Sequence, residues 1–202
     1  MVLGLSYVSY DQFKRFGESS KDIKLPEIEI PETKLEEFFS PTAEGDKEWV
    51  SPNGRLKLTY SAKWTSTDEA FAGSLTQAGI ALEETELLFL AYQIDPSLAF
   101  LMVNKTAGQK SLEEIGRELE GKIKEQGGES EITILEEENE GGELKIISGY
   151  PGQPESYSRG KVIFDQEVIY LVVLSSYQTD WPKFEQEAQK ILDSAQLVSV
   201  AE

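Results

Sequence analysis

The chain has 202 residues, of which 39 % are hydrophobic, which is enough for one domain with a sizeable core and a tail. It carries 37 acidic and 19 basic residues, and the resulting net charge of -18 opposes binding to nucleic-acid phosphates and anionic lipid headgroups. The chain has no Cys and no His, which excludes disulfides, thiolate nucleophiles, Cys/His zinc sites and Ser-His-Asp triads.

The N-terminal stretch MVLGLSYVSY is uncharged, and Lys14 and Arg15 follow it. It is too short to span a bilayer, which takes about 20 apolar residues. Its basic residues come after the apolar run, whereas a signal peptide has them before it. Tyr, Lys and Arg collect at membrane interfaces. We interpret residues 1–17 as the remnant of a membrane anchor, with a short N-terminal helix as the alternative.

Residues 18–45 carry Pro26, Pro31 and Pro41 among many charged residues. Proline fixes φ and removes a backbone donor, so this segment favours an extended conformation. We expect a linker between the anchor and one folded domain that covers residues 46–202.

Within that domain, alternating apolar and polar residues predict a series of strands. Residues 46–64 predict two strands joined by a turn at Pro52-Asn53-Gly54, whose residues supply the required dihedrals. Residues 67–80 predict a short helix or an irregular loop. Further strand pairs are expected at 84–94 with 98–106, 130–139 with 142–151, and 157–166 with 168–177.

Two segments have helical spacing. Leu112, Ile115, Leu119 and Ile123 form one apolar face, Ser111 with Glu114 fits a capping box, and Gly127-Gly128 ends the helix. A last helix is expected to begin near Asp180, with Asp180 or Thr179 as its N-cap.

The order of strands, helix, strands and helix predicts an α+β fold rather than an alternating βαβ series. The segment VIYLVVL is apolar on both faces, so we expect it in the centre of the sheet. These patterns predict a three-layer α/β/α sandwich, with a mainly antiparallel sheet of about six strands and helices on both faces. The extended N-terminal segment precedes it.

Few residues point to a site. The sequence SGYPGQPESYSRG joins two predicted strands and holds Tyr150, Tyr157 and Arg159, residue types common in binding hot spots. We predict a binding loop there, with a rigid surface loop as the alternative. The Glu-rich stretch at 135–143 lacks the spacing of a Ca²⁺ loop and predicts a solvated hairpin tip. No Gly-rich phosphate loop occurs, so we expect neither a cofactor nor a metal site.

Trp181 and Pro182 stand at the start of the last predicted helix. Pro is favoured in a first helical turn because its missing N–H would have no partner there. We interpret this joint as structural: Asp180 caps the helix, and Trp181 covers the end of the core near Trp64, the other Trp at a strand end. Ser175 and Ser176 follow the central strand, but without a His base or a G-x-S-x-G pattern they do not predict a nucleophile.

Two stretches resemble the PsbP-like family, that of the oxygen-evolving-complex subunit P of photosystem II and its bacterial relatives. The segment VIYLVVLSSYQTDWPKFEQEAQKILDSAQLV resembles the end of that family's domain, with Ala195 where the family usually has Phe. The segment LKLTYSAKWT is similar to a Tyr-Pro-x-x-Trp strand end, with Ser61 in place of the Pro. The resemblance covers residues 46–198 and implies an α/β/α sandwich on a membrane-associated, extracytoplasmic protein.

We therefore expect a non-enzymatic, membrane-tethered binding or assembly module, whose partner is another envelope protein or a small ligand and not nucleic acid. Two alternatives remain: a hydrolase or carbohydrate-active enzyme that uses two carboxylates, and a structural stalk domain. The expected location is the extracytoplasmic side of a bacterial membrane, with the cytoplasm as the alternative.

Overall fold

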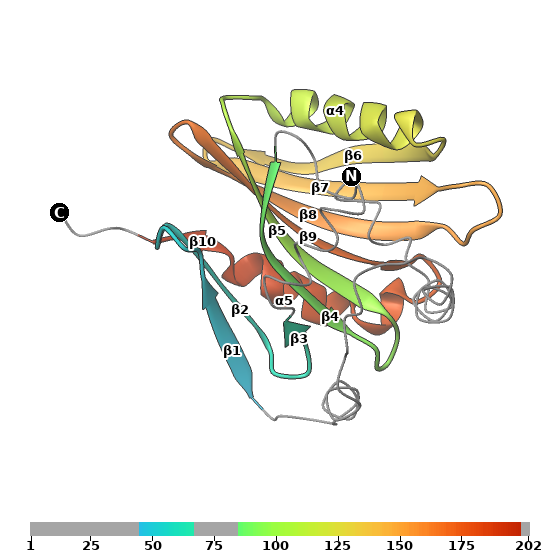
Figure 1. Cartoon of the computed structure of the whole chain (residues 1–202), viewed down its shortest axis with the longest axis horizontal. Helices are drawn as coiled ribbons and strands as arrows, with labels where there is room; N and C mark the ends of the chain where they lie inside the picture. Colours follow the sequence, from blue (N-terminus) through green and yellow to red (C-terminus); the bar gives the residue numbers. More distant parts are fainter. Residues whose placement is uncertain (1–44, 67–84, 199–202) are drawn as a thin grey trace, which may run out of the picture.

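The computed structural model describes residues 45–66 and 85–198 (Figure 1). The expected anchor at 1–17, nearly all of the expected linker and the segment at 67–80 lie outside the described residues. In the two described ranges, no helix is both long enough and apolar enough to cross a membrane.

A seven-stranded sheet with antiparallel neighbours forms the middle of the domain. In spatial order its strands are β3 (Thr65–Ser66), β4 (Thr85–Gln93), β5 (Ala99–Ala107), β9 (Val168–Tyr177), β8 (Ser156–Asp165), β7 (Gly141–Gly149) and β6 (Glu129–Glu138). The prediction of a mainly antiparallel sheet is confirmed. So is the central place of VIYLVVL, because β9 lies between β5 and β8 and is buried from Ile169 to Ser176.

A second, three-stranded sheet consists of β1 (Asp46–Val50), β2 (Leu56–Ser61) and β10 (Gln196–Leu197). The predicted turn joins β1 to β2 and is tied to the main sheet, because Asn53 Nδ2 donates a hydrogen bond to the hydroxyl of buried Tyr170 at 2.7 Å. Separate pairing of these strands was not predicted, since their alternation also fits a strand of the main sheet.

One described helix packs on each face of the large sheet. Helix α4 (Leu112–Glu125) lies along β6 and β7, and helix α5 (Glu185–Ser194) packs between β8 and the small sheet (Figure 1). We call these two sides the α4 face and the α5 face. The expected layering is therefore confirmed in part: the small sheet shares the α5 face with its helix, and the main sheet has seven strands where about six were expected.

Each face has its own apolar core. The α5-face core joins the inward residues of β2 to the main sheet, and it includes both Trp64 and Trp181. The α4-face core joins the predicted apolar stripe of α4 to residues of β5, β7, β8 and β9. These two cores follow from the period of two in the strands and of 3.6 in the helices.

The start of α4 agrees with its sequence signal. The Ser111 hydroxyl accepts a hydrogen bond from the Glu114 backbone N–H, and the Glu114 carboxylate accepts one from the Ser111 backbone N–H. The Glu114 carboxyl has a pKa below its ordinary value, because the Ser111 backbone N–H donates to its charged form. The predicted capping box is confirmed.

The start of α5 differs from its prediction. Residues Trp181–Lys183 form a 3-10 turn, η2, and α5 itself begins at Glu185 with Phe184 in the cap position. The Asp180 side chain caps neither turn nor helix; its Oδ1 instead accepts a hydrogen bond from Lys183 Nζ at 2.5 Å. The capping role predicted for Asp180 is wrong, because the 3-10 turn separates Asp180 from the first α-helical residue.

Candidate functional site

The three residues predicted to share a binding loop do not all lie together. Tyr150 follows β7 on the α4 face, where its hydroxyl donates a hydrogen bond to Gln126 Oε1 at 3.0 Å. Tyr157 and Arg159 belong to strand β8 and pair in register with residues of β9 on the α5 face. The structure therefore brings Tyr157 and Arg159 together and leaves Tyr150 on the other side of the sheet.

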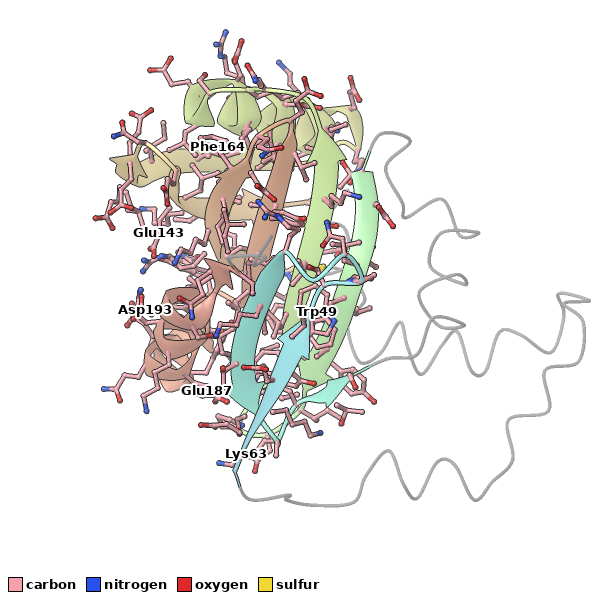
Figure 2. All side chains as sticks on the ribbon, turned by 90° about the vertical axis from the view of Figure 1, so that its left-hand side faces the viewer. Trp49, Lys63, Glu143, Phe164, Glu187 and Asp193 are labelled. Carbon is pink, nitrogen blue, oxygen red and sulfur yellow. The ribbon has the colours of Figure 1, made fainter. Side chains whose placement is uncertain are left out.

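Both residues on β8 contact groups of the same domain. Arg159 forms an ion pair with Glu143 of β7, and Tyr157 packs on Trp181 with ring centroids 4.4 Å apart. Burial raises the pKa of the Tyr157 hydroxyl above its ordinary value, so this group is neutral at pH 7. Gln189 Nε2 of α5 donates to Glu143 Oε1 at 3.5 Å and to Asp193 Oδ1 at 2.8 Å. Figure 2 shows Glu143 and Asp193 on the same side of the domain. These contacts stabilise the packing of α5 on the sheet. A binding role for Tyr150, Tyr157 and Arg159 stays a prediction.

Trp64 and Trp181 both lie in the α5-face core, as expected. Trp64 is fully buried and its Nε1 donates to Glu187 Oε1 of α5 at 2.9 Å. Trp181 is 4 % exposed and also packs on Phe184, with ring centroids 4.7 Å apart. Their burial supports the structural interpretation of the joint.

The serines at the end of β9 are also inside the sheet. Ser175 is fully buried and its Oγ accepts a hydrogen bond from Ser158 Oγ at 2.8 Å. Ser176 is 3 % exposed and donates to the Tyr177 carbonyl at 3.0 Å. Both hydroxyls therefore form hydrogen bonds within the domain.

A small pocket opens between α4 and the sheet. Its volume is about 50 Å³. It is lined by hydroxyl and amide groups from β4 and β5, by charged groups on and just before α4, and by aliphatic side chains of α4 and β9: Thr85, Asn104, Thr106, Lys110, Ile115, Glu118, Leu119, Lys122, Ile169 and Leu171. We call this the α4 pocket.

Asn104 is the unusual residue of the α4 pocket. It lies on β5 in register with Leu87 of β4 and Leu171 of β9, and it is 5 % exposed. Among the residues that the structure describes, its Nδ2 has no hydrogen-bond partner. A buried amide without a partner costs free energy, so natural structures rarely leave one without a reason.

Two lysines and one carboxylate form the charged side of the pocket. Glu118 Oε2 accepts a hydrogen bond from Lys110 Nζ at 2.6 Å, and Glu118 Oε1 accepts one from Lys122 Nζ at 3.1 Å. The hydrogen bond from Lys110 holds the pKa of the Glu118 carboxyl below its ordinary value, although burial opposes this effect. Glu118 is therefore ionised at neutral pH, and the three groups leave one net positive charge at the pocket.

The sequence signal for this pocket is a polar residue in an apolar run. In AFLMVNKT, the period of two puts Asn104 on the same face as Phe100 and Met102. The sequence does not single out Lys110 and Lys122, because a basic residue on or next to a helix is normally solvated. Only the packing of α4 on the sheet brings Lys110 and Lys122 to Asn104.

Comparison with known proteins gives a match in structure and none in sequence. No family model matches the chain, and no curated protein matches it either. The solution structure of cyanobacterial PsbP from Synechocystis sp. matches with a TM-score of 0.53 at 8 % identity, over 78 % of this chain and 95 % of that one. The chain has the PsbP-like fold.

A second solved structure, the Ran-binding protein Mog1p of Saccharomyces cerevisiae, matches with a TM-score of 0.50 at 8 % identity. That match covers 78 % of this chain and 97 % of Mog1p. At such low identity these likenesses define the fold alone. They confirm the PsbP-like fold that the resemblance implied.

Proposed function

We propose that the chain is a non-enzymatic binding or assembly module with a protein partner, tethered to a membrane on its extracytoplasmic side. The observation that carries the proposal is the small volume of the α4 pocket. Its volume of about 50 Å³ lies below the roughly 300–1,000 Å³ of pockets that enclose drug-sized ligands. A pocket of this size is too small for a drug-sized substrate, which favours recognition of a large partner through the surface of the domain.

The same pocket argues against a hydrolase that uses two carboxylates. That chemistry needs one carboxyl group with a raised pKa to act as the acid, next to a second carboxylate. In the α4 pocket the acidic residue is Glu118, and its pKa is lowered. Within the described residues, no three Asp or Glu side chains gather as a metal-binding group.

Three further observations support the proposal. Mog1p, a protein of the same fold, is a Ran-binding protein, which makes a protein partner plausible for this fold. The aromatic and basic N-terminal stretch and the Pro-containing segment at 18–45 support the tether. The acidic net charge of -18 favours a partner with a basic surface.

The test has two separate readouts. The product of the natural gene, expressed in a bacterium at low level, is located by fractionation and then crosslinked in place before purification. We expect it in the membrane fraction with one dominant crosslinked protein. A chain found wholly in the cytosol would contradict the tether. A chain with no crosslinked partner would contradict the binding module and favour the stalk domain.

A further inference from the structure

We propose that the α4 pocket is a binding site for a small aliphatic carboxylate. Lys110 and Lys122 bind the carboxylate, and the Asn104 amide donates a hydrogen bond to it from the sheet. The aliphatic side chains that line the pocket contact its short apolar tail. This inference is independent of the protein partner proposed above. It begins from Asn104, whose presence the fold does not explain.

An asparagine at this position works against stability. The neighbours of Asn104 in the sheet, Leu87 and Leu171, are aliphatic and lie on the same face. A Leu would bury apolar surface here, whereas the amide leaves its Nδ2 without a partner among the described residues. A residue that departs in this way from the apolar pattern of its strand and core is expected chiefly at a functional site.

The charges of the pocket select an anion. Each ammonium group has three N–H donors, and the Nζ of Lys110 and that of Lys122 each bond to one Glu118 oxygen. Within the described part of the chain, these two bonds leave further donors on both groups for a ligand. Because the chain as a whole has a charge of -18, a site with a net positive charge stands out from its surroundings. A cation would meet one carboxylate that two lysines already neutralise.

The walls and the size of the pocket narrow the class of anion. The pocket is lined on its apolar side by Ile115 and Leu119 of α4 and by Ile169 and Leu171 of β9. A phosphate ion would leave these aliphatic groups unused, whereas a short-chain carboxylate buries its tail against them. The volume of about 50 Å³ limits the ligand to a few carbon atoms.

The experiment uses the full chain labelled with ¹⁵N, titrated with sodium butyrate at constant ionic strength and pH 7. We expect a saturable shift of the Asn104 side-chain amide signal, with a dissociation constant of about millimolar order because butyrate has few atoms. Butylammonium has the same tail with a positive charge, and phosphate is an anion without a tail. Neither should shift this signal. An unshifted signal with butyrate, or an equal shift with either control, would overturn the proposal.

Two variants separate a binding site from a structural feature. Lys122→Gln should weaken butyrate binding about tenfold, since it removes one charge-assisted hydrogen bond. Lys124→Gln is the matched control, because Lys124 is exposed on the same helix outside the pocket. An equal loss in both variants would contradict the site.

Asn104→Leu should abolish butyrate binding and raise the melting temperature by about 2–4 °C or more, because it removes a buried amide without a partner. Lost binding together with a higher melting temperature is specific to a binding residue, because replacing an asparagine that stabilises the fold would lower the melting temperature. A lower melting temperature, a chain that fails to fold, or retained binding would each overturn the proposal.

Discussion

Trp181 packs between two aromatic rings of the α5-face core, those of Tyr157 and Phe184. Its position before α5 also fixes where that helix meets the sheet, so its burial is central to the joint. We expect Trp181→Ala to lower the free energy of unfolding by about 3–5 kcal/mol, as for large aromatic residues in other cores. Urea unfolding followed by circular dichroism measures this change.

Two controls sharpen this prediction. Trp181→Phe should cost less, because among the described residues Trp181 Nε1 has no hydrogen-bond partner to lose. Trp49→Ala should also cost less, because Trp49 is only partly buried against the same core. A Trp181→Ala chain with unchanged unfolding but lost partner binding would instead assign Trp181 to a binding surface.

Asp165 and Arg55 connect the large sheet to the turn after β1. Arg55 Nε donates to Asp165 Oδ2 at 2.9 Å and Nη2 donates to Oδ1 at 2.5 Å, a two-pronged pair. The Asp165 side chain is 10 % exposed and that of Arg55 is 32 % exposed. The hydrogen bonds from Arg55 lower the pKa of the Asp165 carboxyl below its ordinary value.

This lowered pKa predicts a pH-dependent contribution to stability. A carboxyl whose pKa is lower in the folded state stabilises the fold above its unfolded pKa of about 3.9, and this contribution is lost as pH falls through the folded value. We expect Asp165→Asn to cost about 1–2 kcal/mol at pH 7, since partial exposure of Arg55 weakens the pair. The difference from wild type should shrink below about pH 4 in urea unfolding series. A difference that stays constant down to pH 2 would contradict this assignment.

At the level of whole elements, the hairpin between β6 and β7 shows how a glycine pair can be misread. A glycine pair between two strands is typical of a hairpin turn, but here the turn is Asn139-Glu140, and Gly141 and Gly142 begin β7. Gly141 has a φ of 146°, and a Cβ there would lie 1.9 Å from the Val162 carbonyl oxygen. These glycines are therefore required by the close approach of neighbouring strands.

Gly141→Ala and Gly121→Ala form a matched pair of substitutions. Gly141→Ala should destabilise the domain by more than about 2 kcal/mol, because the strand backbone must shift to admit the methyl group. Gly121 lies inside α4 with open space around its would-be Cβ, so Gly121→Ala should stabilise by about 0.5–1 kcal/mol. Thermal unfolding of both variants measures the contrast. Equal effects would show that the crowding at Gly141 has no energetic consequence.

Local signals predict these elements better than their partners. The capping box and apolar stripe of α4 and the alternation of the strands depend on residues near in sequence, and they were predicted correctly. The separate sheet of β1, β2 and β10 depends on contacts across more than 100 residues, such as Thr59 N–H with Ser194 Oγ. Periodicity carries no information about such pairing.

The candidate site shows the same division. Tyr157 and Arg159 belonged both to the predicted strand at 157–166 and to the predicted binding loop. The strand is confirmed, because β8 begins at Ser156 and only residues 150–155 lie between the strands. Asn104 was visible as a polar break in an apolar strand, yet its meaning depends on Lys110 and Lys122. Those lysines come from an element that follows β5 and folds back over the sheet.

On the scale of the molecule, one edge of the large sheet carries only acidic charges. Among the described strands, β6 pairs only with β7, so its other side is an edge. Acidic residues are spread along this strand: Glu129, Glu131, Glu136, Glu137 and Glu138. An edge strand has unpaired backbone groups that can pair with a second chain, and repeated charge opposes such pairing.

Neutralising one end of this edge should therefore promote self-association. We expect the triple change of Glu136, Glu137 and Glu138 to Gln to raise the sedimentation coefficient above that of the wild-type chain at equal concentration. The matched control changes exposed Glu113, Glu120 and Glu125 of α4 to Gln, which alters the net charge by the same amount away from the edge. An equal increase in both variants would assign the effect to net charge. An increase for the β6 variant alone would show that β6 is an edge kept unpaired by its own carboxylates.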